Sequence, residues 1–294
     1  MQKLLITGIT GSFGRAFLKH VESNTTWDIV GIARNESKLE ELAAAGTRAR
    51  LLPRDITDPY LDIDCDAIVH AAALKRVDSS YENPEEYARI NIGGTVNIAR
   101  LAKSKQARLL FISSDKACQA HNIYGATKRV GEGIVIAAGG SAVRGGNVWM
   151  SSGSVSQKFA AAVLGGYSAV LYDAEATRFN AGMPFWVNFV LTCLLQMNGG
   201  EIWAPKLRAY QMGDLADAFR SVHGLQIMHG NRQQGDKRAE YLVSPIEARW
   251  TKDIGTAYIQ GGDWVGTAAP AEGVSSKTAR RMSILDLQEL VRQL

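Results

Sequence analysis

Short apolar runs alternate with amphipathic stretches through the first half of the chain. Strands are predicted for the β-rich apolar runs at residues 3–7, 28–33, 50–52, 67–71, 109–113 and 142–144. The spacing of apolar positions predicts helices over residues 13–22, 37–45, 84–104 and 124–137. Strands that alternate with helices indicate a parallel sheet covered on both faces. The expected fold class is therefore α/β, with a Rossmann-like, doubly wound parallel sheet.

The alternation loosens beyond about residue 150. Helices are predicted over residues 155–164, 184–197, 214–223 and 283–294, with short strands between them, such as 201–204. Residues 230–238 are polar and contain glycine, which predicts a loop. We expect a main domain over residues 1–150, to which later segments return, and a small C-terminal lobe over 151–294. The cleft between two such lobes is the expected place for a substrate.

Composition excludes disordered and fibrous classes of protein. Of the 294 residues, 46% are hydrophobic and 21% charged, and 29 are glycine. The net charge of +4 is spread along the chain, so a nucleic-acid partner is not expected. The three cysteines, Cys65, Cys118 and Cys193, are isolated and form no metal-ligand spacing, so no metal site is predicted.

Targeting signals are not evident in the pattern of apolar residues. The first residues run directly into a strand pattern, and the apolar run 185–195 is interrupted by Asn188 and Thr192. That run is shorter than the ~18 residues that a membrane-spanning helix needs. We expect a cytoplasmic protein with no membrane partner.

A glycine-rich turn follows the first predicted strand and opens the first predicted helix. It reads Thr-Gly-Ile-Thr-Gly-Ser-Phe-Gly over residues 7–14. In such a turn the first glycine allows a tight bend, the second lets the backbone approach a pyrophosphate, and the third lets helix and strand pack closely. The helix amino terminus then receives the phosphates. The sequence predicts a dinucleotide site that includes Gly8, Thr10, Gly11, Ser12, Phe13 and Gly14.

Basic residues at the end of the second predicted strand favour NADP over NAD. An acidic residue in this position accepts the ribose hydroxyls of NAD. Here Arg34 occupies the position, and Lys38 lies one helical turn further on, so both can meet a 2′-phosphate. Glu36 between them weakens this argument slightly.

A second cluster of polar residues follows the strand at 109–113. Ser114, Asp115 and Lys116 come first, and Tyr124 and Lys128 follow at the start of a predicted helix. Residues four apart on a helix share one face, so the Lys128 ammonium can lie beside the Tyr124 phenol. We expect that cation to lower the pKa of Tyr124 and to favour a base that takes a hydroxyl proton.

These motifs resemble the extended short-chain dehydrogenase/reductases, and within them the soluble, C5-inverting UDP-N-acetylglucosamine 4,6-dehydratases of pseudaminic acid-type pathways. The similarity runs through nearly the whole chain. It includes Ser114-Asp115-Lys116-Ala117, Tyr124-Gly125-Ala126-Thr127-Lys128, Gly146-Asn147-Val148 and Thr177-Arg178-Phe179. Larger membrane-anchored relatives carry Met at the position of Tyr124. The resemblance implies that the NADP site also includes Asp55, Ile56, Ala71, Ala72, Ala73, Lys75 and Asn91, together with Tyr124 and Lys128.

The Asp-Lys pair suits a dehydratase on chemical grounds. Oxidation at C4 makes the C5 proton acidic, and a base beside a neutral acid can then expel the C6 hydroxyl as water. Lys116 is the candidate base and Asp115 the candidate acid, while Ser114, Tyr124 and Lys128 serve the oxidation. Asp115 must be protonated, which requires burial or a change of charge on substrate binding. NADP is expected to stay tightly bound and to be recycled.

The resemblance also implies a UDP-sugar site and a homo-oligomer. Candidate substrate residues are Lys75, Asn147, Val155, Arg178, Lys206, Arg232 and Glu240. The chain departs from the family pattern at Gly145, where relatives have an aromatic residue, and at Ser151-Ser152, so the identity of the sugar is open. The alternatives are a nucleotide-sugar epimerase or reductase of the same superfamily and a non-catalytic NADP-binding protein. His70 is assigned a structural role near the cofactor.

Overall fold

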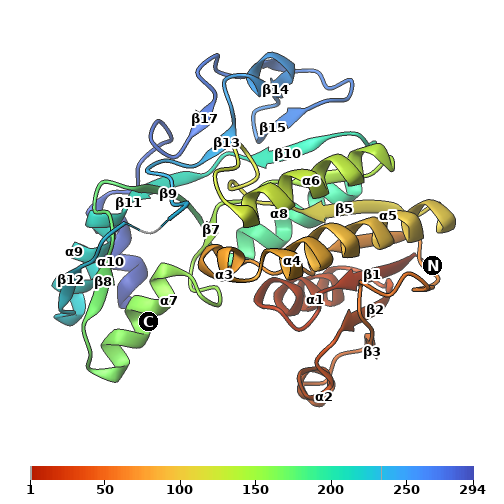
Figure 1. The fold of residues 1–294 in the computed structure, drawn as a ribbon, viewed down its shortest axis with the longest axis horizontal. Coiled ribbons are helices and arrows are strands. Elements are labelled where there is room, and N and C mark those ends of the chain that lie inside the picture. The colour runs from red at the N-terminus through yellow and green to blue at the C-terminus, as the bar shows by residue number, and fades with distance from the viewer. Residues whose placement is uncertain (1, 233) are drawn as a thin grey trace.

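A ten-stranded sheet runs through the molecule (Figure 1) in the computed structural model, which describes residues 2–232 and 234–294. The strand order is β16-β14-β15-β10-β6-β5-β4-β1-β2-β3, and the strands from β10 to β3 are parallel. The predicted α/β, Rossmann-like fold is thereby confirmed. The bounds are β1 Lys3–Thr7, β2 Asp28–Ala33, β3 Arg50–Pro53, β4 Ala67–His70, β5 Arg108–Ile112, β6 Ser141–Val143, β10 Ile202–Pro205, β14 Thr251–Asp253, β15 Ala257–Gln260 and β16 Thr267–Ala268.

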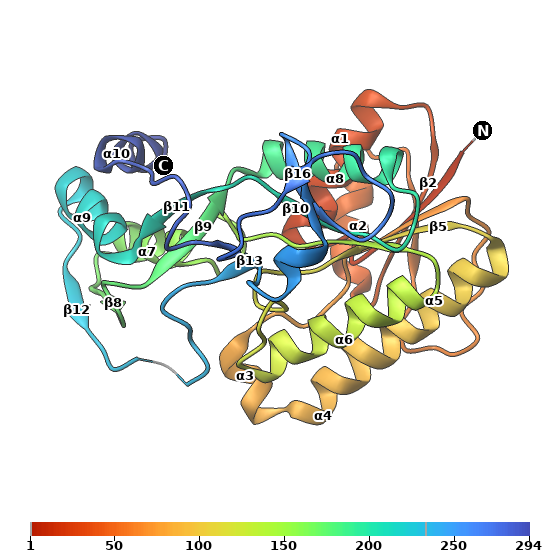
Figure 2. The same ribbon diagram turned by 90° about the horizontal axis from the view of Figure 1, so that it is seen from above.

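Helices cover both faces of this sheet (Figure 2). On one face lie α1 (Ser12–Asn24), α2 (Glu36–Ala44) and α8 (Met183–Gln196). On the other lie α5 (Gly94–Lys105) and α6 (Ile123–Ala137), with α3 (Val77–Glu82) and α4 (Pro84–Tyr87) at its end. Because parallel strands are buried on both faces, β1 reads as a continuous apolar run, Leu4-Leu5-Ile6.

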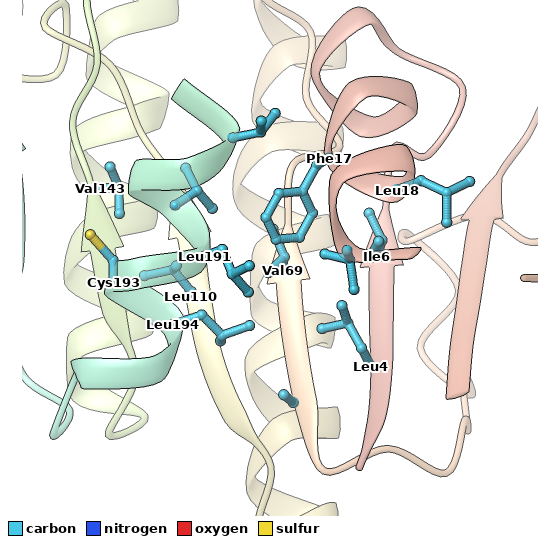
Figure 3. Close-up of a cluster of buried hydrophobic side chains, with 14 of the residues drawn as sticks. Leu4, Ile6, Phe17, Leu18, Val69, Leu110, Val143, Leu191, Cys193 and Leu194 are labelled. Carbon is cyan, nitrogen blue, oxygen red and sulfur yellow. The ribbon is translucent and has the colours of Figure 1, made fainter. Parts of the chain in front are cut away.

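Helix α8 comes from the second half of the chain and completes the core of the first. Leu191 and Leu194 of α8 meet Phe17 of α1 over β1, β4 and β5 (Figure 3). Each fully buried side chain of this size contributes about 1.5–3 kcal/mol to folding. Within the part of the chain that the structure describes, no helix is long and apolar enough to span a bilayer.

The helix predicted over residues 84–104 is interrupted by a π-helical turn. Helix α4 leads into a π-helix at Ala88–Gly93, and α5 continues from it. The wider turn directs the Asn91 side chain to the Leu74 backbone, where it accepts from the amide at 2.8 Å and donates to the carbonyl at 2.9 Å. Turns of this kind are frequent at functional sites.

Most of the remaining elements gather at one end of the large sheet, at the left of Figure 1. Helices α7 (Val155–Gly165), α9 (Met212–His223) and α10 (Ile284–Arg292) share one apolar cluster, and the helix η2 (Glu247–Trp250) lies nearer the sheet. The strands are very short, so their period of two is hard to see in the sequence. They pair as β11 (Arg208–Gln211) with β9 (Thr177–Ala181) and β7 (Asn147–Val148), β12 (Ile227–His229) with β8 (Ala169–Leu171), and β13 (Tyr241–Val243) with β17 (Val274–Ser275).

Candidate active site

The glycine-rich turn between β1 and α1 approaches the end of β4 closely. Gly8 adopts a φ of 70°, and a Cβ there would lie 2.8 Å from the Ala72 backbone. A Cβ at Gly14 would lie 2.4 Å from the Gly8 carbonyl oxygen, so α1 could not pack against the turn. The turn is thus a backbone cradle with no room for side chains, which fits the phosphates of a dinucleotide.

A cavity of about 360 Å³ opens over this cradle, at the carboxyl ends of the parallel strands. It brings together most of the residues that the sequence assigned to the cofactor. The lining includes Gly8, Thr10, Gly11, Ser12, Phe13, Gly14, Arg34, Lys38, Asp55, Ile56, Ala71, Ala72, Ala73 and Lys75. Asn91 lies behind the lining and holds the Leu74 backbone.

One end of the cavity carries three cationic side chains, Arg34, Lys38 and Arg54. Arg34 lies 4.0 Å from Asp55 and is half exposed, so its guanidinium remains accessible. Asn35 caps α2 by accepting a hydrogen bond from the Lys38 amide at 2.9 Å. This cap places Lys38 in the first turn of α2, beside the end of β2. Arg54 was missed because its position before Asp55 carries no motif.

His70, at the end of β4, is buried and hydrogen-bonded on both sides. Its Nδ1 lies 2.7 Å from the Thr7 hydroxyl, and its Nε2 lies 3.1 Å from the Thr95 hydroxyl. Burial lowers the pKa of His70 to about 3, so the imidazole is neutral at physiological pH. These contacts support the structural role expected for it.

Helix α6 packs against the loop that carries Ser114, Asp115 and Lys116. Asn122 caps the helix by accepting from the Gly125 amide at 2.7 Å. A Cβ at Gly125 would lie 2.2 Å from the Lys116 carbonyl oxygen, so only glycine allows this approach. The resulting contact brings both halves of the predicted catalytic cluster together.

Tyr124, Lys128 and Glu132 follow one another at four-residue spacing on the inner face of α6. Glu132 accepts from the Ser113 hydroxyl at 2.6 Å and pairs with Arg144 at 2.8 Å, which fixes the helix against β5 and β6. The Lys128 ammonium nitrogen lies 3.9 Å from the centre of the Phe111 ring.

The prediction that Lys128 lowers the pKa of Tyr124 is wrong for this structure. Burial raises the pKa of Tyr124, and only Ser114 and Lys116 among the polar groups around it act in the opposite direction. Burial also lowers the pKa of Lys128 to about 7, so near neutral pH this side chain is charged only part of the time. Desolvation of the Tyr124 phenol therefore has a larger effect on its pKa than the nearby Lys128 ammonium on which the prediction was based.

Asp115 and Lys116 form a buried ion pair that continues to Glu240. The Lys116 Nζ lies 3.2 Å from Asp115 Oδ1 and 3.1 Å from Glu240 Oε1. The Ser114 hydroxyl donates to Asp115 Oδ1 at 3.0 Å. The other carboxylate oxygen of Asp115, Oδ2, is buried without a hydrogen-bond partner. An unpartnered buried carboxylate oxygen is costly unless it is protonated or meets a ligand.

Burial and the neighbouring charges shift the pKa values of Asp115 and Lys116. Burial raises the pKa of Asp115, which favours the neutral acid. Burial opposes the ammonium form of Lys116, but the carboxylates of Asp115 and Glu240 outweigh it and raise the pKa of Lys116. Lys116 therefore holds its proton in this state.

A larger cavity of about 650 Å³ adjoins this cluster, between α7, β8 and the segment around residue 236. Lys116 lies on its wall. Of the residues assigned to the substrate, this cavity brings together Asn147, Val155, Arg178 and Arg232. Arg178, which donates to the Thr177 carbonyl at 2.9 Å, and Arg232 supply cationic groups to it.

The other substrate candidates lie elsewhere. Lys206 pairs with Asp253 at 2.7 Å and is not among the described residues that line the larger cavity. Lys75 lines the cofactor cavity and donates to the Ser152 carbonyl at 2.7 Å. Glu240 is 1% exposed and contacts Lys116, not the cavity.

Two residues near the cluster were not assigned from the sequence. Lys237 lies 2.9 Å from Glu240 and lines the larger cavity. The buried Tyr210 hydrogen-bonds to Asn147, and burial raises its pKa. Lys237 falls in the loop predicted over residues 230–238, five residues after Arg232, whereas β11, which carries Tyr210, gave no signal.

An aromatic side chain of α8 lies beside Gly145, the position where the sequence departs from the family pattern. A Cβ at residue 145 would lie 2.1 Å from the Trp186 ring, so an indole from α8 fills the space beside this glycine. The Gly145 carbonyl accepts from the Asp115 amide at 2.8 Å. Gly145 thus holds the loop of Ser114, Asp115 and Lys116 through its backbone, and Trp186 packs against Gly145. Within the described ranges, no group of three His, Cys, Asp or Glu residues is placed to hold a metal ion.

Two curated relatives cover most of the chain. The UDP-N-acetylglucosamine 4,6-dehydratase (inverting) of Campylobacter jejuni subsp. jejuni serotype O:2 is 31% identical over 275 residues, 87% of this chain and 82% of that protein. The UDP-glucose 4-epimerase of Rickettsia canadensis is 31% identical over 278 residues, 87% of this chain and 81% of that protein. Both names refer to UDP-sugars, but they differ in the sugar and in the reaction.

Solved structures share the fold. The structure of Pen from Bacillus thuringiensis has a TM-score of 0.92 at 24% identity and covers 99% of this chain and 97% of its own. The dTDP-glucose 4,6-dehydratase DesIV from Streptomyces venezuelae, solved with NAD and TYD bound, has a TM-score of 0.71 at 19% identity, over 80% and 86%. Residues 4–260 match the family described as polysaccharide biosynthesis protein. The chain therefore belongs to this family of polysaccharide biosynthesis proteins, within the extended short-chain dehydrogenase/reductases.

Proposed function

We propose that this chain is an NADP-dependent 4,6-dehydratase of UDP-N-acetylglucosamine. Its product is a UDP-4-keto-6-deoxy-N-acetylhexosamine, with inversion at C5. The observation that carries the proposal is the 3.2 Å contact between buried Asp115 and Lys116, of which Lys116 lies on the wall of the larger cavity. Such a pair supplies the acid and the base of an elimination, whereas a C4 epimerisation needs neither.

The cofactor proposed is NADP rather than NAD. Arg34, Lys38 and Arg54 surround one end of the cofactor cavity, where a 2′-phosphate would meet charged donors. The fold family implies a nicotinamide cofactor, which supplies a reversible acceptor of hydride when bound. Lys128 on α6 is the residue proposed to hold its ribose.

Tyr124 is the proposed base for the C4 hydroxyl. The phenol is buried on α6, beside Ser114 and Lys116, and both of these favour its ionised form. Burial opposes ionisation of the phenol, so the fraction of Tyr124 that is ionised is the one that can accept the proton of the C4 hydroxyl.

Lys116 and Asp115 are the proposed base and acid of the elimination. Lys116 Nζ removes the C5 proton, and Asp115 gives a proton to the departing C6 hydroxyl. Burial raises the pKa of Asp115, which supports a protonated acid there. The hydride taken from C4 returns to C6, and a proton reaches C5 from the face opposite to the one from which Lys116 removed it, which gives the inverted configuration.

The larger cavity is the proposed UDP-sugar site. Arg178 and Arg232 offer two guanidinium groups to the diphosphate, whose desolvation is costly unless cations meet it. Asn147 and Val155 complete the wall nearest to Lys116. A homo-oligomer in a pseudaminic acid-type pathway belongs to the same proposal.

A UDP-glucose 4-epimerase is the second candidate, because relatives with that name are as similar as the dehydratase. An epimerase removes and returns hydride at C4 and leaves C5 untouched, so the two reactions differ in solvent exchange. A non-catalytic NADP-binding protein would give neither product.

Reaction in deuterated water separates these candidates. We expect incubation with UDP-N-acetylglucosamine to place solvent deuterium at C5 of the product, detected by proton NMR, because elimination breaks the C5–H bond. A C4 epimer that keeps its C5 proton would favour the epimerase. Tight NADP binding with no turnover would favour the non-catalytic protein.

A further inference from the structure

A second buried ion pair, Glu240 with Lys237, lies behind Lys116 and has no part in the chemistry described so far. Lys237 Nζ lies 2.9 Å from Glu240 Oε2, and Glu240 Oε1 lies 3.1 Å from Lys116 Nζ. Glu240 is 1% exposed and Lys237 is 8% exposed. The four charged groups from Asp115 to Lys237 thus form one buried chain.

The surrounding backbone holds this pair in place. The Glu240 amide donates to the Ser276 hydroxyl at 2.9 Å, and that hydroxyl donates to the Thr177 carbonyl at 3.0 Å. Lys237 Nζ donates to the Cys118 carbonyl at 2.9 Å. Because Cys118 follows Lys116 in the same loop, Lys237 also ties this loop to the segment before β13.

The proposed elimination presents a problem of charge. It needs a neutral amine at Lys116 and a neutral acid at Asp115, whereas Lys116 in this structure is an ammonium between two carboxylates. Transfer of one proton from Lys116 Nζ to a carboxylate oxygen of Asp115 solves it: an N–H bond breaks and an O–H bond forms. The net charge of Asp115, Lys116, Glu240 and Lys237 is zero both before and after the transfer. Glu240 and Lys237 keep their opposite charges throughout.

We propose that Glu240 and Lys237 are positioning residues, whose ion pair holds Lys116 against Asp115 and balances the buried charge while the proton moves from Lys116 to Asp115. This inference rests on the proposed function, and it replaces the substrate contact predicted for Glu240. Without Glu240, Lys116 loses one of the two carboxylates that hold its Nζ, and the positive charge of Lys237 is left buried and unpaired.

The electrostatics favour Asp115 over Glu240 as the proton acceptor. Burial opposes ionisation of Glu240, but the charges of Lys116 and Lys237 outweigh it and lower the pKa of Glu240 to about 2. Burial raises the pKa of Asp115. The titratable and charged groups around Lys116 are Asp115 on its own loop, Tyr124 on α6, Arg178 on β9, Tyr210 on β11, and Glu240 with Lys237 before β13.

The first test measures Lys116 directly and needs no substrate. In protein labelled with ¹³C at lysine Cε, NMR titration gives the pKa of Lys116, whose signal is assigned by its loss in Lys116→Arg. In Glu240→Gln we expect the pKa of Lys116 to fall by about one unit or more, since one of its two carboxylates is gone. The exposed Glu272→Gln is the matched control.

The second test uses charge balance in the reaction. Glu240→Gln should lower kcat about 100-fold and change KM less than about threefold, because Lys116 is no longer held against Asp115 and Lys237 is left unpaired, whereas no substrate contact is lost. The double variant Glu240→Gln with Lys237→Met removes both charges, so it should recover about tenfold in kcat over Glu240→Gln alone. Glu240→Asp, which keeps the charge, should retain most of the activity.

Each outcome decides the inference. An unchanged Lys116 pKa in Glu240→Gln, a double variant no faster than Glu240→Gln, or a rise in KM at constant kcat would overturn it. If the unmodified protein releases no water from UDP-N-acetylglucosamine, the proposed function fails. The titration of Lys116 then still decides whether Glu240 acts on it.

Discussion

At the scale of single residues, the chemistry depends on where buried charge is placed. Asp115 is 1% exposed and leaves one carboxylate oxygen unpartnered, while Lys116 contacts two carboxylates. Tyr124 lies beside them, and burial raises its pKa. In the proposed reaction, oxidation at C4 and elimination across C5–C6 therefore rest on different side chains, which substitutions can separate.

Replacement of the base should stop the reaction after its first step. In Lys116→Ala we expect dehydration to fall at least about 100-fold, because the amine that contacts Asp115 is lost. Tyr124 is intact, so bound NADP should still become reduced when the substrate is added, which fluorescence of the reduced cofactor measures. Lys252→Ala, an exposed change on β14, is the control. Full turnover in Lys116→Ala would remove the base assignment.

Tyr124→Phe should block the step that Lys116→Ala leaves intact. Without the phenolate, reduced cofactor should not form, and its rate of formation should drop at least about 100-fold. Because burial raises the pKa of Tyr124, the ionised fraction in the unmodified protein grows about tenfold per pH unit through the neutral range. Stopped-flow fluorescence should therefore show cofactor reduction that accelerates with pH; a rate independent of pH, or a fast Tyr124→Phe, would contradict the role of this base.

At the scale of elements, two helix amino termini organise the two cavities. Helix α2 begins where Arg34 and Lys38 meet the end of β2, and α6 begins where Gly125 meets the Lys116 carbonyl. Caps at Asn35 and Asn122 determine where each helix starts. The affinity for cofactor and the geometry of the catalytic loop can be tested at these two points.

Loss of one cation near α2 should weaken NADP selectively. For Arg34→Ala we expect the Kd of NADP to rise about tenfold or more, while the Kd of NAD changes less than about twofold, because only NADP carries the 2′-phosphate. Fluorescence titration measures both constants. Lys19→Ala, exposed on α1, serves as the control. An equal loss for both cofactors would contradict the preference for NADP.

Two glycines of α6 make a matched pair. Gly125→Ala places a Cβ 2.2 Å from the Lys116 carbonyl oxygen, so we expect lower stability and at least about a tenfold loss of kcat. A Cβ at the exposed Gly133 meets nothing within 4 Å, so Gly133→Ala should stabilise the protein by about 0.5–1 kcal/mol and leave kcat unchanged. Urea unfolding and steady-state kinetics measure both. Equal behaviour of the two variants would show that the close approach is unimportant.

Sequence alone predicts the elements whose signals are local. The glycine turn, the Ser114-Asp115-Lys116 loop and the Tyr124–Lys128 spacing lie within short segments. The structure brings most of the residues assigned to the cofactor to one cavity, but Asn91, Tyr124 and Lys128 are not among the described residues that line it. Contacts between distant segments leave no such pattern: Lys237 reaches Lys116 through Glu240, and Lys206 turns to Asp253. The pKa of Tyr124 was misjudged because desolvation depends on the whole surrounding packing.

At the scale of the whole molecule, the second half of the chain completes the first. Helix α8 covers one face of the large sheet, and β10, β14, β15 and β16 extend it (Figure 1). Arg144 joins these parts from a buried position, since it pairs with Glu132 of α6 and Glu247 of η2. Removal of one partner of a buried ion pair strongly destabilises the folded protein.

This junction predicts how stability depends on pH. Burial opposes ionisation of Glu247, but Arg144 outweighs it and lowers the pKa of Glu247 from 4.5 to about 2. The stabilisation, about 3 kcal/mol, is present above pH 4.5 and lost as the pH falls through about 2. In Glu247→Gln we expect lower stability at pH ~7 and a weaker pH dependence below pH ~4.5, measured by urea unfolding. Glu272 is exposed near β17, so Glu272→Gln should keep the pH dependence of the unmodified protein. If the stability of Glu247→Gln falls below pH ~4.5 as steeply as that of the unmodified protein, this account is contradicted.

The mass of the product formed from UDP-N-acetylglucosamine tests the central claim most directly. Purified full chain, loaded with NADP, is incubated with this substrate, and nucleotide sugars are separated and weighed by mass spectrometry. The account predicts a product lighter than the substrate by one water, with no net consumption of cofactor and no such product from Lys116→Ala. Unchanged substrate, or an isomer of equal mass alone, would contradict it.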